Sequence, residues 1–357
     1  MTKIAIICDT HNGVRGDSPY FHEYLARSYS WFFNELKDRN IDEVIHLGDL
    51  YDRRKYVSFL TAHRTRKDFL EKFDDLGIHM HVISGNHDIY YKNVNSINAL
   101  DELVTGRYTN IKTYTSPTQL KYDGTIIQLI PWILESNSKE SYDAISNTKA
   151  EILMGHFEVE GFELLRGIKS EHGDKLDIFD RFDLVFSGHY HHKSSKDGFH
   201  YLGAFAEYTW SDYNDPRGFT VFDTQTRIFE FVRNPNSIFK MIAYDDVKYP
   251  NILDLIREKD YSEYKDTYVR IVSVNRTNTY AFDFLLDKLY KECPIDISII
   301  EDVKSLGDEN YDMENLDTNV QDTTSIMNSY IDNLTLPVDR AIMKNYIQNI
   351  YKEALSI

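Results

Sequence analysis

Five short polar motifs each follow a short apolar run, and this pattern limits the fold more than any other feature of the sequence. The motifs combine glycine with aspartate, asparagine and histidine, and they are Asp9-Thr10-His11, Gly48-Asp49-Leu50-Tyr51-Asp52, Gly85-Asn86-His87-Asp88, Gly155-His156 and Gly188-His189-Tyr190-His191. Short apolar runs bounded by turn residues are typical of buried strands. Residues that directly follow the strands of an α/β sheet gather at one edge, where binding sites form. The sequence therefore predicts one crevice to which all five motifs contribute.

The first part of the chain alternates predicted strands with predicted helices. Apolar runs indicate strands at 4–8, 43–47 and 79–84. Apolar residues that recur with helical spacing indicate helices at 20–38 and 59–76, the second of them ended by Gly77. This βαβαβ order predicts a parallel sheet with helices on its faces.

From about residue 111 the pattern changes to short strands separated by Gly, Asn and Asp turns. The predicted strands are 125–130, 152–154, 184–187, 200–202, 219–223 and 228–232. A second sheet packed against the first predicts an α/β fold, a two-sheet sandwich with flanking helices.

We expect four segments along the chain. The sandwich covers 1–238, and a small β-α-β domain at 239–302 contains predicted strands 267–274 and 295–300 around a helix at 280–290. A linker rich in Asp, Asn and Glu follows at 303–323, and two amphipathic stretches broken by a proline predict a helical hairpin at 324–357.

Bulk composition limits the partners and the compartment. The formal charge is −17, whereas a protein that grips nucleic acid by itself normally has a basic face. A polyanionic substrate would therefore need local basic patches, metals or a partner. The two cysteines, Cys8 and Cys293, form no disulfide framework, and neither a signal peptide nor a membrane-spanning run is visible. We expect a soluble, cytoplasmic protein that does not associate with membranes.

The polar motifs offer ligands for two divalent metals. Asp9, His11 and His191 would hold the first metal, and Asn86, His156 and His189 the second. Asp49 would bridge them, with one carboxylate oxygen for each. Two cations about 3.5–4 Å apart can clamp the attacking and leaving oxygens of a displacement at phosphorus and acidify a bridging water. Mixed imidazole and oxygen ligands suit Mn²⁺, Fe or Zn²⁺ better than an all-oxygen magnesium site does.

Three residues beside the predicted ligands have other expected roles. His87 would contact the phosphate or protonate the leaving oxygen as a general acid. Asp88 would hold the His87 imidazole by a second hydrogen bond. Asp52 would either orient a ligand or cap the helix that follows it. By contrast, we interpret His46, His79, His81 and Cys8 as ordinary packed or surface residues, and we do not expect His192 to be a ligand.

The five motifs resemble those of the calcineurin-like metallophosphoesterases. The segments GDLYDRRK, GNHDIYYKN and GHYH, the segment Asn214–Asp223 (NDPRGFTVFD) and the following β-α-β domain are similar to the SbcD family. This family contains nuclease subunits of double-strand-break repair complexes and is related to the meiotic recombination nuclease. The resemblance is strongest over 1–235 and is closest to phage-encoded members.

The resemblance implies a specific activity and specific partners. Such proteins are Mn²⁺-dependent DNA nucleases, exonucleolytic on duplex ends and endonucleolytic on single strands or hairpins, and they act in recombination, repair and replication. They form homodimers through helices, here expected around 59–70 and 94–103. They bind an SbcC-type, SMC-like ATPase through a C-terminal helical segment, here 324–357. A phage-encoded member would act in the host-cell cytoplasm, and the domain at 239–302 would contribute to DNA recognition.

Some relatives carry a histidine that contacts substrate where this chain has Asp52, so Asp52 does not inherit that role. Two groups of residues beside the motifs could contact DNA, and these are Arg53, Arg54 and Lys55 after the second motif and Tyr90, Tyr91 and Lys92 after the third. The first group could equally be a solvated basic turn, and the second could be ordinary packing.

Two other functions use the same metal core. One is a dinuclear-metal phosphatase or cyclic-nucleotide phosphodiesterase, which would need neither the terminal hairpin nor the small second domain. The other is a non-catalytic scaffold, which usually loses metal ligands, whereas all seven are present here. The sequence favours the DNA nuclease.

Overall fold

The computed structural model describes residues 2–165, 168–301, 340, 343–344 and 346–347. The chain divides into two compact units, Met1–Ile238 and Phe239–Ile357. The predicted linker at 303–323 lies outside the described residues. Of the predicted hairpin at 324–357, only residues 340, 343–344 and 346–347 are described, and they are helical. Among the described helices, none has the length and apolar character needed to cross a bilayer.

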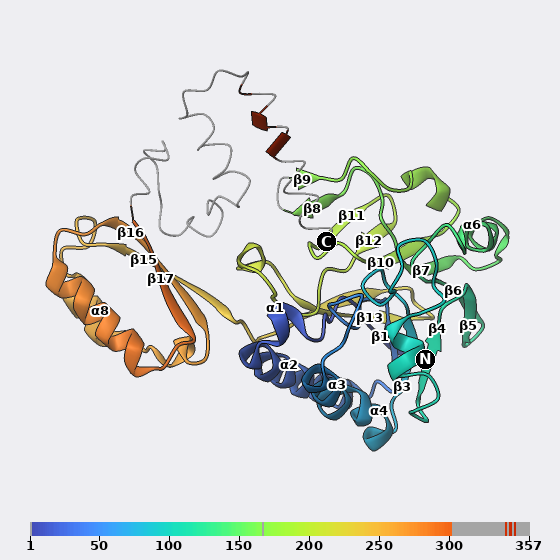
Figure 1. The fold of residues 1–357 in the computed structure, drawn as a ribbon, viewed down its shortest axis with the longest axis horizontal. Coiled ribbons are helices and arrows are strands. Elements are labelled where there is room, and N and C mark those ends of the chain that lie inside the picture. Colours follow the sequence, from blue (N-terminus) through green and yellow to red (C-terminus); the bar gives the residue numbers. More distant parts are fainter. Residues whose placement is uncertain (1, 166–167, 302–339, 341–342, 345, 348–357) are drawn as a thin grey trace. The chain divides into compact units, whose positions relative to one another are not determined.

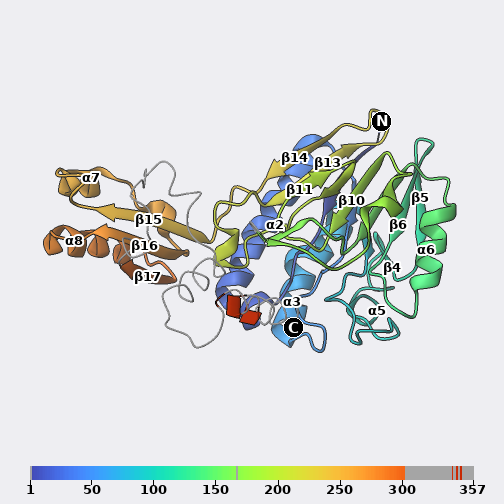
Figure 2. The same cartoon turned by 90° about the horizontal axis from the view of Figure 1, so that it is seen from above.

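The first unit contains two six-stranded sheets (Figures 1 and 2). In the first sheet four neighbouring strands are parallel. The last two strands in sequence extend one edge of the sheet, and each is antiparallel to its inner neighbour. Its spatial order is β14 (Phe229–Arg233), β13 (Gly218–Asp223), β1 (Lys3–Ile7), β2 (Glu43–His46), β3 (His79–Ile83) and β4 (Ile111–Tyr114).

The second sheet also has a parallel centre, with an antiparallel strand on each edge. Its spatial order is β11 (Ser194–Lys196), β12 (Phe199–Tyr201), β10 (Leu184–Gly188), β7 (Ile152–His156), β6 (Thr125–Ile130) and β5 (Thr118–Tyr122). The predicted two-sheet sandwich is therefore confirmed.

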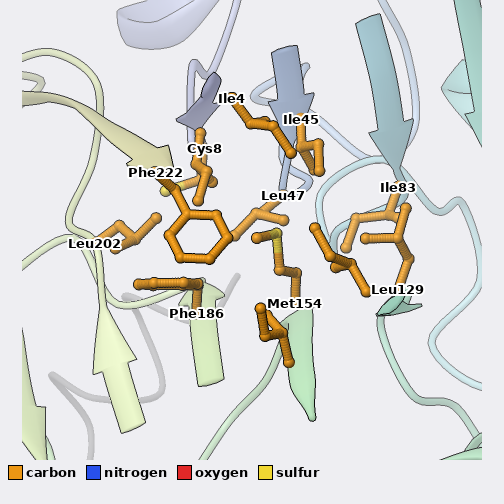
Figure 3. Close-up of a cluster of buried hydrophobic side chains, with 13 residues drawn as sticks. Ile4, Cys8, Ile45, Leu47, Ile83, Leu129, Met154, Phe186, Leu202 and Phe222 are labelled. Carbon is orange, nitrogen blue, oxygen red and sulfur yellow. The ribbon is translucent and has the colours of Figure 1, made fainter. Parts of the chain in front are cut away.

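The core of the sandwich lies between the facing sheets, as Figure 3 shows. Side chains alternate between the two faces of a strand, so every second residue of β1, Ile4, Ile6 and then Cys8, points into this layer. They meet Met154 of β7 and Phe186 of β10 from the opposite sheet, and all five are at most 1% exposed. The packed layer holds the strand ends of the two sheets in fixed positions.

Helices cover the outer face of each sheet (Figure 2). On the first sheet, Phe32 of α2 (Pro19–Arg39) packs on Phe219 with ring centroids 4.9 Å apart. The predicted helix at 59–76 consists of α3 (Phe59–Thr65), a π-helical turn η1 (Arg66–Leu70) and α4 (Glu71–Leu76). On the second sheet, α6 (Ser138–Asn147) buries Ile145 in an aromatic cluster.

Several short elements of the first unit were not predicted from the sequence. Their hydrophobic patterns are too short or too irregular to identify, and they are α1 (Val14–Asp17), α5 (Ala99–Leu103), β4, β5, α6, β8 (Glu163–Leu165), β9 (Ile168–Lys169), η2 (Leu176–Phe179), β11 and η3 (Trp210–Asp212). The strand pattern predicted from residue 111 missed helix α6, because only two of its residues, Ser141 and Ile145, are buried.

The second unit is a three-stranded parallel sheet with its own core. Its described elements are β15 (Phe239–Asp245), α7 (Ile252–Glu258), η4 (Ser262–Tyr264), β16 (Tyr268–Asn275), α8 (Thr279–Lys291) and β17 (Asp296–Glu301). The β-α-β arrangement of β16, α8 and β17 agrees with the prediction, but β15 and α7 precede it. Phe282 of α8 is fully buried and packs edge-on against Tyr244 of β15 at 4.9 Å.

Candidate metal centre

All seven predicted metal ligands lie at or just beyond the carboxyl ends of strands from both sheets. Asp9 and His11 follow β1, Asp49 follows β2 and Asn86 follows β3 in the first sheet. From the second sheet, His156 ends β7, while His189 and His191 follow β10. Five of the seven are at most 7% exposed, and His189 and His191 are half-buried. The structure thus brings together residues that are up to 182 positions apart, from Asp9 to His191.

A first cluster contains Asp9, His11 and His191, each with one potential ligand atom within 4.8 Å of the others. The Nε2 atoms of His11 and His191 are 3.0 Å apart, and His11 Nε2 lies 4.0 Å from Asp9 Oδ1. Two imidazole nitrogens and a carboxylate therefore face one point, as the predicted first metal requires.

A second cluster contains Asn86, His156 and His189. Asn86 Oδ1 lies 2.9 Å from His156 Nε2 and 3.1 Å from His189 Nδ1. The other nitrogen of His156, Nδ1, lies 2.7 Å from the carbonyl oxygen of Leu47. A histidine ligand commonly donates its second nitrogen to a carbonyl in this way, which fixes the tautomer and turns Nε2 toward the metal.

Asp49 lies between the two clusters. Its Oδ2 is 3.7 Å from His11 Nε2 and 3.4 Å from His156 Nε2, while its Oδ1 accepts a hydrogen bond of 2.8 Å from the His87 backbone. We expected one oxygen to serve each metal. The structure differs, because Oδ1 is already held by His87 N–H and the single oxygen Oδ2 faces both clusters.

The backbone at these ligands has an uncommon conformation. Asp9, His11, Asp49 and His189 have φ angles of 52°, 41°, 56° and 86°. Non-glycine residues seldom adopt positive φ, although Asp and His do so more often than most, and such strain concentrates at functional sites. The sharp turns aim consecutive side chains back toward the strand ends.

Two glycines are required because the loops after β2 and β3 touch each other. A Cβ on Gly48, whose φ is 91°, would lie 2.7 Å from the Cα of Gly85. A Cβ on Gly85 would lie 2.2 Å from Asp49 Oδ1. A side chain at Gly85 would push Asp49 away from the clusters, and one at Gly48 would separate the two loops and displace His156.

The charges in the site favour a bound cation. Burial lowers the pKa of His11 and of His156, but the surrounding aspartates, Asp49 above all for His156 and Asp52 and Asp49 for His11, outweigh it and raise both pKa values to about 9. Burial lowers the pKa of His189 to about 3 and that of His191 well below its ordinary value, so these two are neutral at pH 7. The carboxylates thus require positive charge, while neutral imidazole nitrogens are available as ligands.

The amide of Asn86 provides a direct test of whether the site suits a metal. Its Oδ1 faces two imidazole nitrogens, whereas a turned amide would give its nitrogen to those imidazoles and to Asp49 Oδ2 at 3.3 Å, and its oxygen to Arg54 Nη2 at 3.2 Å. Without a cation, hydrogen bonding favours the turned amide. With a cation, the observed orientation places oxygen and nitrogen lone pairs around one point, so the donor set fits a divalent metal.

Two of the predicted auxiliary roles need correction. The Asp88 carboxylate does not hold the His87 ring. Its oxygens accept hydrogen bonds from the backbone N–H groups of Asp49, Leu50, Tyr51 and Gly85 at 2.9–3.3 Å, and therefore join the loops after β2 and β3. The partner of His87 Nδ1 is instead the carbonyl oxygen of Asp52 at 2.6 Å.

The proposed capping role of Asp52 is also wrong, because the N-cap of α3 is Ser58, whose hydroxyl accepts from Thr61 N–H at 3.1 Å. The side chain of Asp52 instead approaches a predicted ligand, since its Oδ1 lies 3.4 Å from His11 Nδ1. His11, Asp52 and His87 form a third group of close potential ligand atoms.

Comparison with known proteins agrees with this geometry. Residues 2–193 match the model of the family described as "Calcineurin-like phosphoesterase". The chain belongs to this family. It is a metal-dependent phosphoesterase, and all seven predicted ligands, from Asp9 to His191, lie within the matched residues.

Two relatives of this phosphoesterase are nucleases by name. The chain is 31% identical to exonuclease subunit 1 of Enterobacteria phage T4 over 353 residues, which is 99% of both chains. It is 25% identical to the SbcD subunit of nuclease SbcCD from Staphylococcus saprophyticus over 306 residues, 75% of this chain and 77% of the relative. Among solved structures, a novel archaeal phosphodiesterase aligns with 65% of this chain and 99% of its own at 15% identity and a TM-score of 0.34.

The residues predicted to contact substrate differ in their exposure and in whether they reach a predicted metal ligand. Arg54 is half-buried, burial lowers its pKa, and its guanidinium comes within reach of Asn86. Arg53 and Lys55 are exposed, and Arg53 stacks on Tyr56. Tyr90, Tyr91 and Lys92 are exposed as well, and the two tyrosine rings pack edge-on at 4.7 Å. Only Arg54 therefore has a described contact with a predicted ligand.

Two aromatic residues border the phosphoesterase site without having been predicted. Trp132, two residues beyond β6, packs on His189 with ring centroids 4.9 Å apart. Tyr208 packs against His11 at 5.4 Å, and its hydroxyl donates to the carbonyl oxygen of Asp9 at 2.6 Å. The position of Trp132 just after a predicted strand was a usable signal, whereas Tyr208 lies in an irregular loop and had none.

Proposed function

We propose that this phosphoesterase is a Mn²⁺-dependent DNA exonuclease and endonuclease, the nuclease subunit of an SbcCD-like complex for recombination and double-strand-break repair. The observation that carries the proposal is the match to phage T4 exonuclease subunit 1 over 99% of both chains. A relative that shared only the metal core would align over the first unit alone. The similarity to the SbcD subunit of nuclease SbcCD supports the same substrate class and assembly.

The seven ligands have separate roles in the site. Asp9, His11 and His191 would hold one divalent metal, Asn86, His156 and His189 would hold the other, and Asp49 would serve both, since its Oδ2 faces the two clusters. A bound metal pair supplies a nucleophile near neutral pH and offsets the charge that develops at phosphorus. The left-handed backbone and the two glycines keep the ligands in place before substrate arrives.

His87 is the residue that we assign to the reacting oxygens. Its Nδ1 lies 2.6 Å from the Asp52 carbonyl, which leaves Nε2 available, and Nε2 has no hydrogen-bond partner among the described residues. The ring is half-buried and lies 4.9 Å from that of His11. From there Nε2 orients the phosphate or gives a proton to the leaving 3′-side oxygen.

Because the chain is acidic, only local positive groups can contact the phosphates of DNA. With a net charge of −17, the protein relies on the metals, on Arg54 beside the clusters and on the exposed Arg53, Lys55 and Lys92 for phosphate contacts. The ATPase subunit supplies further attraction. Because the nuclease subunit has few positive groups of its own at the site, we expect it to bind DNA weakly without the ATPase.

The assembly is expected to be a homodimer that also carries the ATPase. On the first unit, Phe59 is 97% exposed and Leu60 44% exposed at the start of α3. Large apolar side chains exposed in this way mark association surfaces. The dimer is therefore proposed to form around 59–70 and 94–103, and the segment 324–357 to bind the coiled-coil base of an SbcC-type ATPase.

The experiment that tests the function is nucleotide release from end-labelled duplex DNA with Mn²⁺, compared with a chelator control and a small phosphomonoester. Chelator-sensitive degradation of DNA with little monoester turnover is expected. Turnover of the monoester or of a cyclic nucleotide without DNA cleavage would favour the phosphatase alternative, which uses the same two clusters.

Replacement of His87 by Ser is expected to leave Mn²⁺ binding intact and to lower the cleavage rate by about 10²–10⁴-fold, the usual contribution of a general acid. Stoichiometry by calorimetric titration and single-turnover cleavage rates check both halves of this prediction. A matched control is His79→Ser, which changes an exposed histidine on β3. Normal cleavage by the His87 variant would show that the assigned role is wrong.

Deletion of 324–357 is expected to spare Mn²⁺-dependent cleavage and to abolish association with the ATPase. Co-purification of the two subunits measures association, and cleavage of single-stranded DNA measures the activity that remains. A truncated chain that still binds the ATPase would refute the assignment of this segment.

A further inference from the structure

The Asn214–Asp223 segment supports the SbcD resemblance, yet none of its residues has a role in the proposed reaction. At its centre is Arg217, which is only 4% exposed. A buried guanidinium is costly unless its charge is paired, and here the two terminal nitrogens have partners although Nε has none among the described residues. Arg217 Nη2 lies 2.7 Å from Asp212 Oδ1 and 3.0 Å from Asp215 Oδ2, and both carboxylates are buried as well.

The other arm of the guanidinium reaches the first metal cluster. Arg217 Nη1 donates a hydrogen bond to the backbone carbonyl oxygen of His191. The planar guanidinium of Arg217 therefore joins the loop that carries His191 to the two aspartates of the 205–217 loop. A lysine could not span both sides, because its charge and its donors are on a single nitrogen.

The same network also reaches Asp9. Asp212 Oδ2 accepts hydrogen bonds from the backbone of Tyr208 at 2.7 Å and of Thr209 at 2.8 Å. Tyr208 in turn donates its hydroxyl to the carbonyl oxygen of Asp9 at 2.6 Å. Arg217 thus fixes one ligand of the first cluster directly and a second through Asp212 and Tyr208.

The second cluster is held mainly by other means. His156 is the last residue of β7, and its ring is fixed by the Leu47 carbonyl. Asn86 follows β3 on the loop that Asp88 joins to the loop after β2. His189 shares the loop of His191, but its ring packs on Trp132 and its Nδ1 faces Asn86. No described contact connects Arg217 to the side chains of these three residues.

We propose that Arg217 is a positioning residue chiefly for the first metal, one that sets the affinity of the cluster of Asp9, His11 and His191 without touching metal or substrate. The inference rests on the proposed metal chemistry and gives the Asn214–Asp223 segment a role. Loss of the Arg217 guanidinium would free the backbone of His191 directly and would reach the second cluster only through His189 of the same loop.

The test is a Mn²⁺ titration of the full-length Arg217→Lys protein by calorimetry and by electron paramagnetic resonance. Of two Mn²⁺ ions bound by the wild type, one is expected to bind about 10–100-fold more weakly, the range found when partners of metal ligands are removed. The affinity of the other should change much less, because Asn86 and His156 are held outside this network. Raised Mn²⁺ should restore cleavage, because the variant loses occupancy and not a reacting group.

Arg181→Lys is the matched control. Arg181 also donates from its guanidinium to backbone carbonyl oxygens, those of Ile145 and Thr148, which belong to neither ligand loop. Both Mn²⁺ affinities should stay at wild-type values in this variant. If Arg181→Lys weakens one site as much as Arg217→Lys does, the effect belongs to protein stability in general and the proposal fails.

Tyr208→Phe gives a second measurement that removes one hydroxyl and no charge, and it applies if Arg217→Lys does not fold. The same single site should weaken, by a smaller factor. Unchanged affinities in Tyr208→Phe and Arg217→Lys, or equal weakening of both sites, would overturn the proposal. Failure of the proposed function is separate, because it would appear as a wild type that binds two Mn²⁺ ions but does not cleave DNA.

Discussion

The two metal clusters differ in how the fold holds them. In the second cluster His156 belongs to strand β7, and its ring is fixed by the carbonyl of Leu47, which directly follows β2 of the opposite sheet. In the first cluster Asp9 and His11 lie on left-handed backbone beyond β1, and His191 lies on a loop fastened by Arg217. The second cluster therefore has one ligand, His156, fixed within a strand, whereas all three ligands of the first lie beyond strand ends and depend more on contacts from a distant loop.

This difference suggests that the first metal is the more easily lost of the two. Strands are stabilised by the whole packed core, while a loop is stabilised by the few contacts that it makes. Metal affinity depends on how rigidly ligands are held, because a bound cation must offset the cost of ordering them. Mutations and pH changes that act on one cluster or on both can test the comparison.

The largest effect is expected from Asp49→Asn, because Asp49 Oδ2 faces both clusters. Both Mn²⁺ affinities should fall, and cleavage should drop by more than about 100-fold, since even partners outside the ligand set contribute about 10–100-fold. Calorimetric titration and cleavage rates measure the two losses. Asp75→Asn, on an exposed helix surface, is the control and should behave as wild type. An effect on one site alone would contradict the bridging position of Asp49.

An intermediate effect is expected when one ligand of each cluster is replaced. His191→Asn should weaken one Mn²⁺ ion and His156→Asn the other, so that each variant keeps one site of wild-type affinity. Because β7 is held by the core, His156→Asn should also lower the melting temperature more than His191→Asn does. Titration and thermal unfolding of both variants check these orders. Loss of both metals in either variant would mean that the clusters are not independent.

The smallest expected effect is a pH dependence of the metal-free protein. The aspartates raise the pKa of His11 and His156 to about 9, against about 6.5 for an unfolded histidine. A raised pKa contributes stability that is complete below pH 6.5 and is lost as the pH rises through 9. In chelator, the melting temperature should fall from pH 6.5 to 9, by about 2–4 °C for each kcal/mol lost.

Added Mn²⁺ should remove most of this fall, because the cation replaces the protons that the aspartates attract. Melting curves with chelator and with Mn²⁺ between pH 6 and 10 measure the difference. His11→Asn and His156→Asn should each remove part of the fall in chelator. A melting temperature that does not change with pH in chelator would show that these histidines are not charged in the folded protein.

Sequence reasoning recovered the ligand set and the two-sheet fold because both leave local signals. Each ligand follows an apolar run, and residues after parallel strands converge at one sheet edge. The predicted clusters of Asp9, His11 and His191 and of Asn86, His156 and His189 are brought together as expected. Their role as metal ligands remains a prediction until metal is measured.

Roles that depend on which atoms face each other were predicted less well. Asp88 was placed beside His87 because the two are neighbours in sequence, but successive side chains on a sharp turn point in different directions. Its carboxylate joins four backbone N–H groups instead. Asp52 was a possible helix cap by position alone, yet α3 begins seven residues later, at Phe59, with Ser58 as its cap.

Local sequence patterns were enough to predict the main strands and helices and the chemical groups of the site, because strand periodicity and ligand types are local properties. Tertiary structure alone decided that Asp49 presents one oxygen to both clusters, that Trp132 and Tyr208 border them, and that Arg217 fastens His191. These contacts join residues from separate loops whose approach depends on the packing of the two sheets. Local sequence patterns do not specify these distances, which are set by the packing of the folded core.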